Sequence, residues 1–311
     1  MDERPIGIFD SGVGGLTVLN EYLSVLPNEN YIYFGDTARL PYGSKSEQTI
    51  IEYSKQIADF LISKDVKMIV IACGTASAIA YNTLKNFYNI PILDIITPTA
   101  QKLSANSIGV IATKATIRNG AWEKEITKFS PNSQITSIAC PLFVPIIEEG
   151  LANSKIADLA ITEYLSKFKN IDALILGCTH YPILKDKIED TIGKNVEIIN
   201  PGTYSAEFAK KFLEGTNLLN TPNTSGKIDF YSSDDTAYFK DVACTFFPMH
   251  NHEVKRVNFW VAFYQVYIYT KFDKFIWRNE YEKWKRCNTC YRDCNYNCNF
   301  TYCFNQYNCW K

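Results

Sequence analysis

The sequence carries almost no net charge and has no long uninterrupted hydrophobic run. Its 32 lysines and arginines nearly balance 33 aspartates and glutamates, which gives a formal net charge of -1 over 311 residues. Such a chain lacks the electrostatic footprint for nucleic acid or an anionic membrane, so neither is expected as a partner. The apolar segment 259–269 is too short to span a bilayer and is broken by Gln265. No charged stretch followed by an apolar stretch opens the chain, and we therefore expect a cytoplasmic protein.

A familiar nucleotide-binding pattern is also missing. The loop from Asp10 to Gly15 joins a predicted strand to a predicted helix, as nucleotide-binding loops do. Thr17, however, stands where the third glycine of a dinucleotide fingerprint belongs, and no Gly-Lys-Ser/Thr follows. Glycines let the backbone approach a ligand, and a helix N-terminus favours an anion. The loop is therefore interpreted as a tight turn or as a site for a substrate carboxylate.

Two cysteines, Cys73 and Cys178, stand in equivalent settings. Each follows a short apolar run that predicts a buried parallel strand, and each precedes small polar residues and a predicted helix. Parallel strands present reactive groups at their carboxyl ends, so the pattern predicts two thiols facing one site. His180 lies two residues after Cys178 and can assist proton transfer near neutral pH, and Asp10 can do so near Cys73.

Two thiols on opposite faces of a carbon atom suit proton abstraction beside a carboxylate. One thiol abstracts and the other delivers, which inverts the stereocentre. A free cysteine titrates at about 8.5 and a helix N-terminus lowers this pKa, so both thiols are expected to ionise more readily than usual.

Other interpretations of the cysteines stay open. An acyl-transfer nucleophile at Cys178 would leave Cys73 idle, and a redox pair would more often be Cys-x-x-Cys. A zinc site needs further ligands at short spacing, so no metal is expected. Each cysteine taken alone could be inert, which is our interpretation of Cys140 because it has no polar neighbours.

Strands and helices alternate along the chain, which predicts an α/β fold with mostly parallel sheets flanked by helices. The alternation restarts near Thr97, so we expect two similar domains with the active site in the cleft between them. The first domain would comprise residues 1–96 and about 204–260, and the second residues 97–203.

Several motifs together resemble glutamate racemases of the cofactor-independent aspartate/glutamate racemase family. The motifs are residues 5–15, Gly35-Asp36-Thr37, Pro41-Tyr42-Gly43, the Cys73 segment and residues 176–182, and the resemblance runs from about Pro5 to Trp260. It implies interconversion of L- and D-glutamate without pyridoxal phosphate, supplying D-glutamate for peptidoglycan, by a homodimer with two α/β domains. Aspartate racemase, and a non-catalytic relative that binds an amino acid or a protein partner, are the alternatives.

The resemblance also implies a role for each site residue. Cys73 and Cys178 are the two bases, assisted by Asp10 on one side and by Glu148 and His180 on the other, with Glu149 a weaker candidate than Glu148. The substrate's carboxylates and ammonium would be held by Ser11, Pro41, Tyr42, Gly43, Gly74, Thr75, Thr113, Thr116 and Thr179.

One site position departs from the family pattern. The family has Cys-Asn-Thr after the first thiol, and Gly74 takes the place of the asparagine. A missing amide would leave buried polar atoms unpaired at about 1–3 kcal/mol per group, so we expect slower turnover and a gain on restoring asparagine.

Residues 261–311 form a second departure, since the family's chains would end near Trp260. This segment is dense in Tyr, Phe, Trp, Asn and Cys, and its cysteine spacings fit no zinc template except the pair Cys287-x-x-Cys290. We interpret it as a poorly folded extension, with a metal or partner module as the alternative.

Overall fold

Ten strands form two sheets in the described part of the chain. The computed structural model describes residues 2–220, 226–249 and 251–259, all within one compact unit, Met1–Phe259. The first sheet has the order β10-β9-β2-β1-β3-β4 and the second the order β6-β5-β7-β8. Every strand pairing among these residues is parallel. The predicted domain borders and the extension 261–311 stay predictions, and the extension lies outside the described residues.

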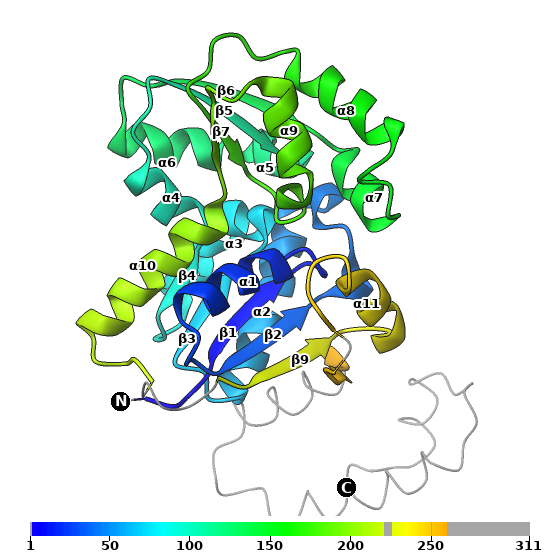
Figure 1. Cartoon of the computed structure of the whole chain (residues 1–311). Helices are drawn as coiled ribbons and strands as arrows, with labels where there is room; N and C mark the ends of the chain where they lie inside the picture. Colours follow the sequence, from blue (N-terminus) through cyan, green and yellow to red (C-terminus); the bar gives the residue numbers. More distant parts are fainter. Residues whose placement is uncertain (1, 221–225, 250, 260–311) are drawn as a thin grey trace, which may run out of the picture. The chain divides into compact units, whose positions relative to one another are not determined.

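The strands of the first sheet are β1 (Ile6–Asp10), β2 (Tyr31–Gly35), β3 (Met68–Ile71), β4 (Ile92–Asp94), β9 (Ile228–Ser232) and β10 (Val254–Arg256). The second sheet contains β5 (Ser107–Ala112), β6 (Gln134–Ala139), β7 (Ala173–Leu176) and β8 (Glu197–Ile199). Strands β1 to β4 and β7 are buried along their whole length, as expected for parallel strands covered on both faces. Helices flank both sheets (Figure 1), which confirms the predicted fold class.

The α-helices follow the strands in the expected alternation. They are α1 (Leu16–Val25), α2 (Glu47–Ser63), α3 (Gly74–Phe87), α4 (Ile96–Lys102), α5 (Lys114–Asn119), α6 (Ala121–Phe129), α7 (Phe143–Glu148), α8 (Lys155–Leu165), α9 (Lys185–Ile192), α10 (Pro201–Gly215) and α11 (Thr236–Ala243). Three short 3₁₀ turns, Thr37–Arg39, Tyr42–Ser44 and Tyr181–Leu184, complete the list. None of the helices described is long and apolar enough to cross a membrane.

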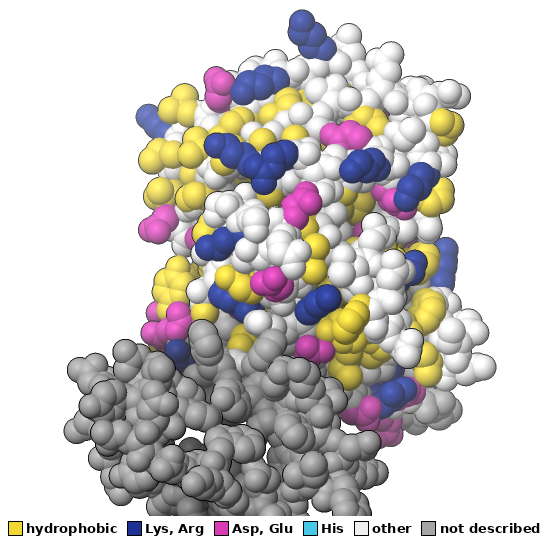
Figure 2. Space-filling view, turned by 180° about the vertical axis from the view of Figure 1, so that it is seen from behind, with side chains coloured by type: hydrophobic (Ala, Val, Ile, Leu, Met, Phe, Trp, Pro, Cys, Tyr) yellow, Lys and Arg dark blue, Asp and Glu magenta, His cyan; other side chains and the backbone are white. Residues whose placement is uncertain are grey.

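One face of the molecule can be inspected in Figure 2. Basic and acidic side chains are interspersed over it, with hydrophobic side chains between them. This distribution agrees with the near-zero net charge of the sequence.

Asp94 ends β4 and begins the connection to α4, where the chain leaves the first sheet. Its Oδ2 accepts hydrogen bonds from the amides of Ile96 (3.1 Å) and Thr97 (3.0 Å). Its Oδ1 is buried without a hydrogen-bond partner among the described residues. Burial raises the pKa of this carboxyl to about 6, because a charge in a dry interior loses its hydration.

The Asp94 carboxyl makes stability depend on pH. A pKa above its unfolded value means that the carboxyl favours folding fully below about pH 4, and that this contribution is lost as pH rises through 6. The difference in unfolding free energy between Asp94→Asn and wild type should change by about 2 kcal/mol in favour of Asp94→Asn when pH is raised from 4.5 to 7.5. Urea unfolding at both pH values measures the gain. Asp172→Asn is the control, because Asp172 also accepts two backbone amides but is exposed. An equal effect of Asp94→Asn at both pH values would contradict the assignment.

Candidate active site

Cys73 ends the loop after β3 and caps the N-terminus of α3. Its Sγ accepts the Ala76 amide at 3.5 Å, and its thiol donates to Ser11 Oγ at 3.5 Å. Burial, with the nearby charge of Asp10, raises the pKa of the Cys73 thiol to about 12. The expectation of a lowered pKa is therefore wrong for Cys73. The thiol is only 5% exposed, and desolvation outweighs the favourable helix end.

Cys178 follows β7 and lies against His180. The Cys178 sulfur is 3.9 Å from His180 Nδ1, and His180 Nε2 is 2.9 Å from Glu148 Oε1. Burial alone would lower the pKa of His180, but its hydrogen bonds to Cys178 and Glu148 prevail and raise it to about 10. The imidazole is thus charged near neutral pH, and its Nδ1 faces the Cys178 sulfur. Glu149, the neighbouring candidate, is exposed.

Asp10 connects the loop after β1 to the turn that carries Cys178. Its Oδ2 accepts the Gly12 amide at 2.9 Å, and its Oδ1 accepts the Thr179 hydroxyl at 3.4 Å. Burial raises the pKa of Asp10, and the charge of His180 opposes this shift. Thr17, the residue that breaks the dinucleotide fingerprint, donates to the Thr179 carbonyl at 2.8 Å. The loop after β1 is therefore bound directly to the turn after β7.

A cluster of three threonine hydroxyls joins the starts of α3 and α5, the helices that follow β3 of the first sheet and β5 of the second. Thr75 Oγ1 and Thr116 Oγ1 each lie 3.0 Å from Thr113 Oγ1, and they are 3.3 Å from each other. Thr75 lies in the first turn of α3, while Thr113 and Thr116 belong to the start of α5. A Cβ on Gly43 would lie 3.3 Å from the Thr113 side chain, so the Gly43 loop also reaches this cluster.

The other two residues of the predicted substrate loop differ in exposure. Pro41 is exposed, whereas Tyr42 is 1% exposed and its hydroxyl donates to Asp36 Oδ2 at 2.5 Å. Asp36 also accepts the Arg39 side chain at 2.7 Å. Asp36 therefore holds the loop, a role that residue spacing did not indicate.

Gly74 is in backbone contact with the turn that carries Cys178. A Cβ built on Gly74 would lie 2.3 Å from the Gly177 carbonyl oxygen and 3.8 Å from Cys178 Cα. Gly177 is itself closely packed, since a Cβ built on it would lie 2.8 Å from Trp122 Nε1. In this structure the asparagine expected at position 74 does not fit. Glycine here permits a close approach of the two cysteine turns.

Two residues that lie against His180, Gly14 and Phe246, are not among the predicted site residues. A Cβ on Gly14 would lie 2.3 Å from the His180 ring, so glycine is required for the first loop to pass the imidazole. Phe246, from the segment after α11, packs its ring against His180 with the centroids 5.2 Å apart. Neither contact has a local signal in the sequence, because each joins segments that are far apart in the chain.

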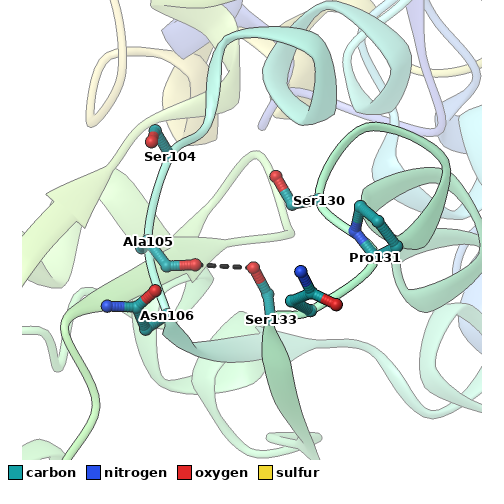
Figure 3. Close-up of a pocket in the computed structure, with 7 residues that line it drawn as sticks. Ser104, Ala105, Asn106, Ser130, Pro131 and Ser133 are labelled. Atoms are coloured by element: carbon teal, nitrogen blue, oxygen red, sulfur yellow. Dashed lines mark hydrogen bonds between the residues drawn. The ribbon is translucent and has the colours of Figure 1, made fainter.

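A cavity of about 260 Å³ lies elsewhere, beside the connections that precede β5 and β6, between residues 104–106 and 130–133 (Figure 3). Its lining carries no titratable side chain, and Ser133 donates to the Ala105 carbonyl at 2.6 Å. None of the predicted site residues lines it, so it has no part in the chemistry of the two thiols. Among the described residues, no group of three or more His, Cys, Asp or Glu is placed to hold a metal ion.

The chain is similar to known proteins in sequence and in fold. A family model described as Asp/Glu/Hydantoin racemase matches residues 15–209. A curated glutamate racemase from Geobacter metallireducens is 44% identical over 245 residues, covering 77% of this chain and 91% of that protein.

Two crystal structures are similar along most of their length. A glutamate racemase from Francisella tularensis, in complex with D-glutamate, aligns with a TM-score of 0.77 at 43% identity and covers 83% of this chain and 99% of its own. A glutamate racemase from Thermus thermophilus, in complex with β-chloro-D-alanine, aligns with a TM-score of 0.75 at 37% identity. The alignment covers 83% of this chain and 98% of that protein.

Proposed function

Because this chain belongs to the Asp/Glu/Hydantoin racemase family, we propose that it is a glutamate racemase that interconverts L- and D-glutamate by proton transfer at Cα. The observation that carries the mechanism is the hydrogen-bonded series Glu148, His180 and Cys178, next to a second buried thiol at Cys73. The pKa of Cys73 also responds to the charge of Cys178. Two thiols in one site can act as a base and an acid in the same turnover.

The two thiols have unequal surroundings, and we assign them different roles. The pKa of about 12 keeps Cys73 protonated, whereas the Cys178 sulfur has the imidazole of His180 3.9 Å away as a partner in proton transfer. In one direction Cys178 takes the Cα proton, and Cys73 gives its own proton to the opposite face of the carbanion. The Cys178 thiol and the Cys73 thiolate that result are the starting state for the reverse direction, so atoms and charge balance over the cycle.

The remaining site residues are proposed to bind the substrate. Hydroxyls of the threonine cluster would exchange their mutual hydrogen bonds for bonds to a substrate carboxylate, since a charged acceptor forms stronger bonds than a neutral one. Ser11 and Thr179 lie beside Cys73 and Asp10, where they can contact the amino-acid end of the substrate. Pro41, Tyr42, Gly43 and Gly74 would shape the wall around it.

The substrate and cellular setting follow from the relatives. The similar proteins are named glutamate racemases, which favours glutamate over aspartate. D-glutamate made in the cytoplasm would supply peptidoglycan synthesis, without pyridoxal phosphate. We also propose a homodimer that binds neither nucleic acid nor membrane.

The proposal is tested by incubating the full chain with L-glutamate and, separately, D-glutamate in heavy water. Chiral chromatography and mass spectrometry should show the opposite enantiomer and deuterium at Cα from both starting materials. L- and D-aspartate serve as the comparison, and a larger kcat/KM for aspartate would identify an aspartate racemase. A folded sample that binds glutamate without exchanging Cα hydrogen would identify a binding protein.

The threonine cluster gives a separate prediction. Thr116→Val keeps the side-chain volume but removes a hydroxyl that lies in the cluster, so we expect KM for glutamate to rise about tenfold with kcat changed less. Steady-state racemisation measures both constants. Thr99→Val is the control, because Thr99 is equally buried but donates to the Ile95 carbonyl within α4. A Thr116→Val enzyme with wild-type KM would remove the cluster from the substrate site.

A further inference from the structure

Phe246 contacts the imidazole that serves Cys178, although it comes from the far end of the described chain. The Phe246 and His180 rings meet edge to face, with an interplanar angle of 83° and centroids 5.2 Å apart. Phe246 is 5% exposed and His180 is 4% exposed. The contact therefore excludes water from one side of a ring whose two nitrogens both have polar partners.

The backbone of Phe246 is fixed on both sides. Its amide donates to the Ala243 carbonyl at 2.9 Å, which continues the last turn of α11. Its carbonyl accepts the Asn20 side chain of α1 at 2.8 Å. Because both backbone groups are bonded, the phenyl ring is held against His180 with little freedom to withdraw.

The polar and charged neighbours of the imidazole face its two nitrogens, whereas Phe246 contacts its ring. Cys178 and Thr179 face Nδ1 at 3.9 and 3.5 Å, Glu148 faces Nε2 at 2.9 Å, and the charge of Asp10 also acts on the ring. These groups set the ring's proton and charge, and the edge-to-face contact with Phe246 adds a steric restraint on the ring's rotation. Interactions between charges are also stronger where water is excluded.

We propose that Phe246 is a positioning residue for the reaction, holding His180 so that Nδ1 faces Cys178 and Nε2 faces Glu148. The inference rests on the proposed racemase function. It assigns Phe246 to one of the two proton transfers, the one in which Cys178 is the base. Loss of the phenyl ring should slow that transfer and leave the Cys73 transfer nearly unchanged.

The test compares Phe246→Leu with Phe247→Leu. Phe247 is a matched control because it is 7% exposed and packs against Phe230 and His252. Initial rates of Cα deuterium incorporation are measured from each enantiomer, and the enantiomer whose exchange is lost in Cys178→Ser identifies the Cys178 transfer. We expect Phe246→Leu to slow exchange from that enantiomer about tenfold, because the reacting groups are less well positioned. Exchange from the other enantiomer should stay within twofold of the wild-type rate. Phe247→Leu should leave both within twofold. Equal loss from both enantiomers, or equal behaviour of the two variants, would overturn the assignment.

A second readout does not depend on turnover. In ¹⁵N-histidine spectra assigned with His180→Asn, the His180 ring N–H should exchange with water at least tenfold faster in Phe246→Leu than in wild type or Phe247→Leu. Unchanged protection in Phe246→Leu would overturn the positioning role even in an active enzyme. A wild type that exchanges hydrogen from neither enantiomer would refute the racemase proposal, and the histidine spectra would still decide whether Phe246 holds the ring.

Discussion

Cys73→Ser and Cys178→Ser should each lower racemisation by at least about a thousandfold, while deuterium exchange at Cα becomes one-sided. A serine hydroxyl is a far weaker acid than a thiol, so it neither forms the required base near neutral pH nor replaces the thiol as proton donor with equal ease. Each variant should retain exchange from the enantiomer whose proton is taken by the remaining thiol. Racemisation needs both transfers and should be lost in both variants.

Cys140→Ser is the control for the cysteine variants. Cys140 is fully buried, and burial raises the pKa of its thiol to about 12, as it does for Cys73. Its thiol donates to the Ile138 carbonyl at 3.7 Å, and the hydrogen bonds described for residues 2–259 join its side chain to no predicted site residue, although the charge of Cys178 acts on it. Activity of Cys140→Ser should stay near wild type. Racemisation that survived in either Cys73→Ser or Cys178→Ser would refute the two-thiol mechanism.

Much of this fold follows from local pattern. Buried parallel strands produce short apolar runs, and the residues just after them reach the carboxyl edge of the sheet, which is why Cys73 and Cys178 were recognisable. Strand β10 was missed because two of its three residues, Lys255 and Arg256, are charged and exposed.

The parts of the site that were not predictable depend on long-range contacts. The pKa of Cys73 was expected to fall because a helix start can be recognised in the sequence. Its burial, which raises the pKa, depends on how the loop after β1 packs. The contacts of Gly14 and Phe246 with His180 also join distant segments. No short sequence window contains both partners of such a pair, so only the structure reveals the contact.

Gly74 also makes a long-range contact that the sequence does not reveal, and this contact reverses the expected effect of asparagine at position 74. From the family pattern alone, glycine is a lost amide and asparagine should restore turnover. The structure instead places the Gly177 carbonyl oxygen 2.3 Å from the position of a Cβ on residue 74. Any side chain there must move one cysteine turn away from the other by a substantial part of an ångström. Misplacement of reacting groups by about 1 Å can cost about a hundredfold in rate.

We therefore expect Gly74→Asn and Gly74→Ala each to lower kcat about a hundredfold, because the Cβ that both introduce causes the displacement. The two hypotheses separate cleanly in steady-state racemisation, since a missing amide would be restored by Asn and not by Ala. Gly215→Asn and Gly215→Ala are matched controls at a helix end where a Cβ meets nothing within 4 Å, and they should keep wild-type kcat. A faster Gly74→Asn enzyme beside a slow Gly74→Ala enzyme would mean that the two turns separate during turnover and that the amide binds substrate. Equal loss in both would mean that this chain has exchanged the amide for direct contact between the turns that carry its thiols.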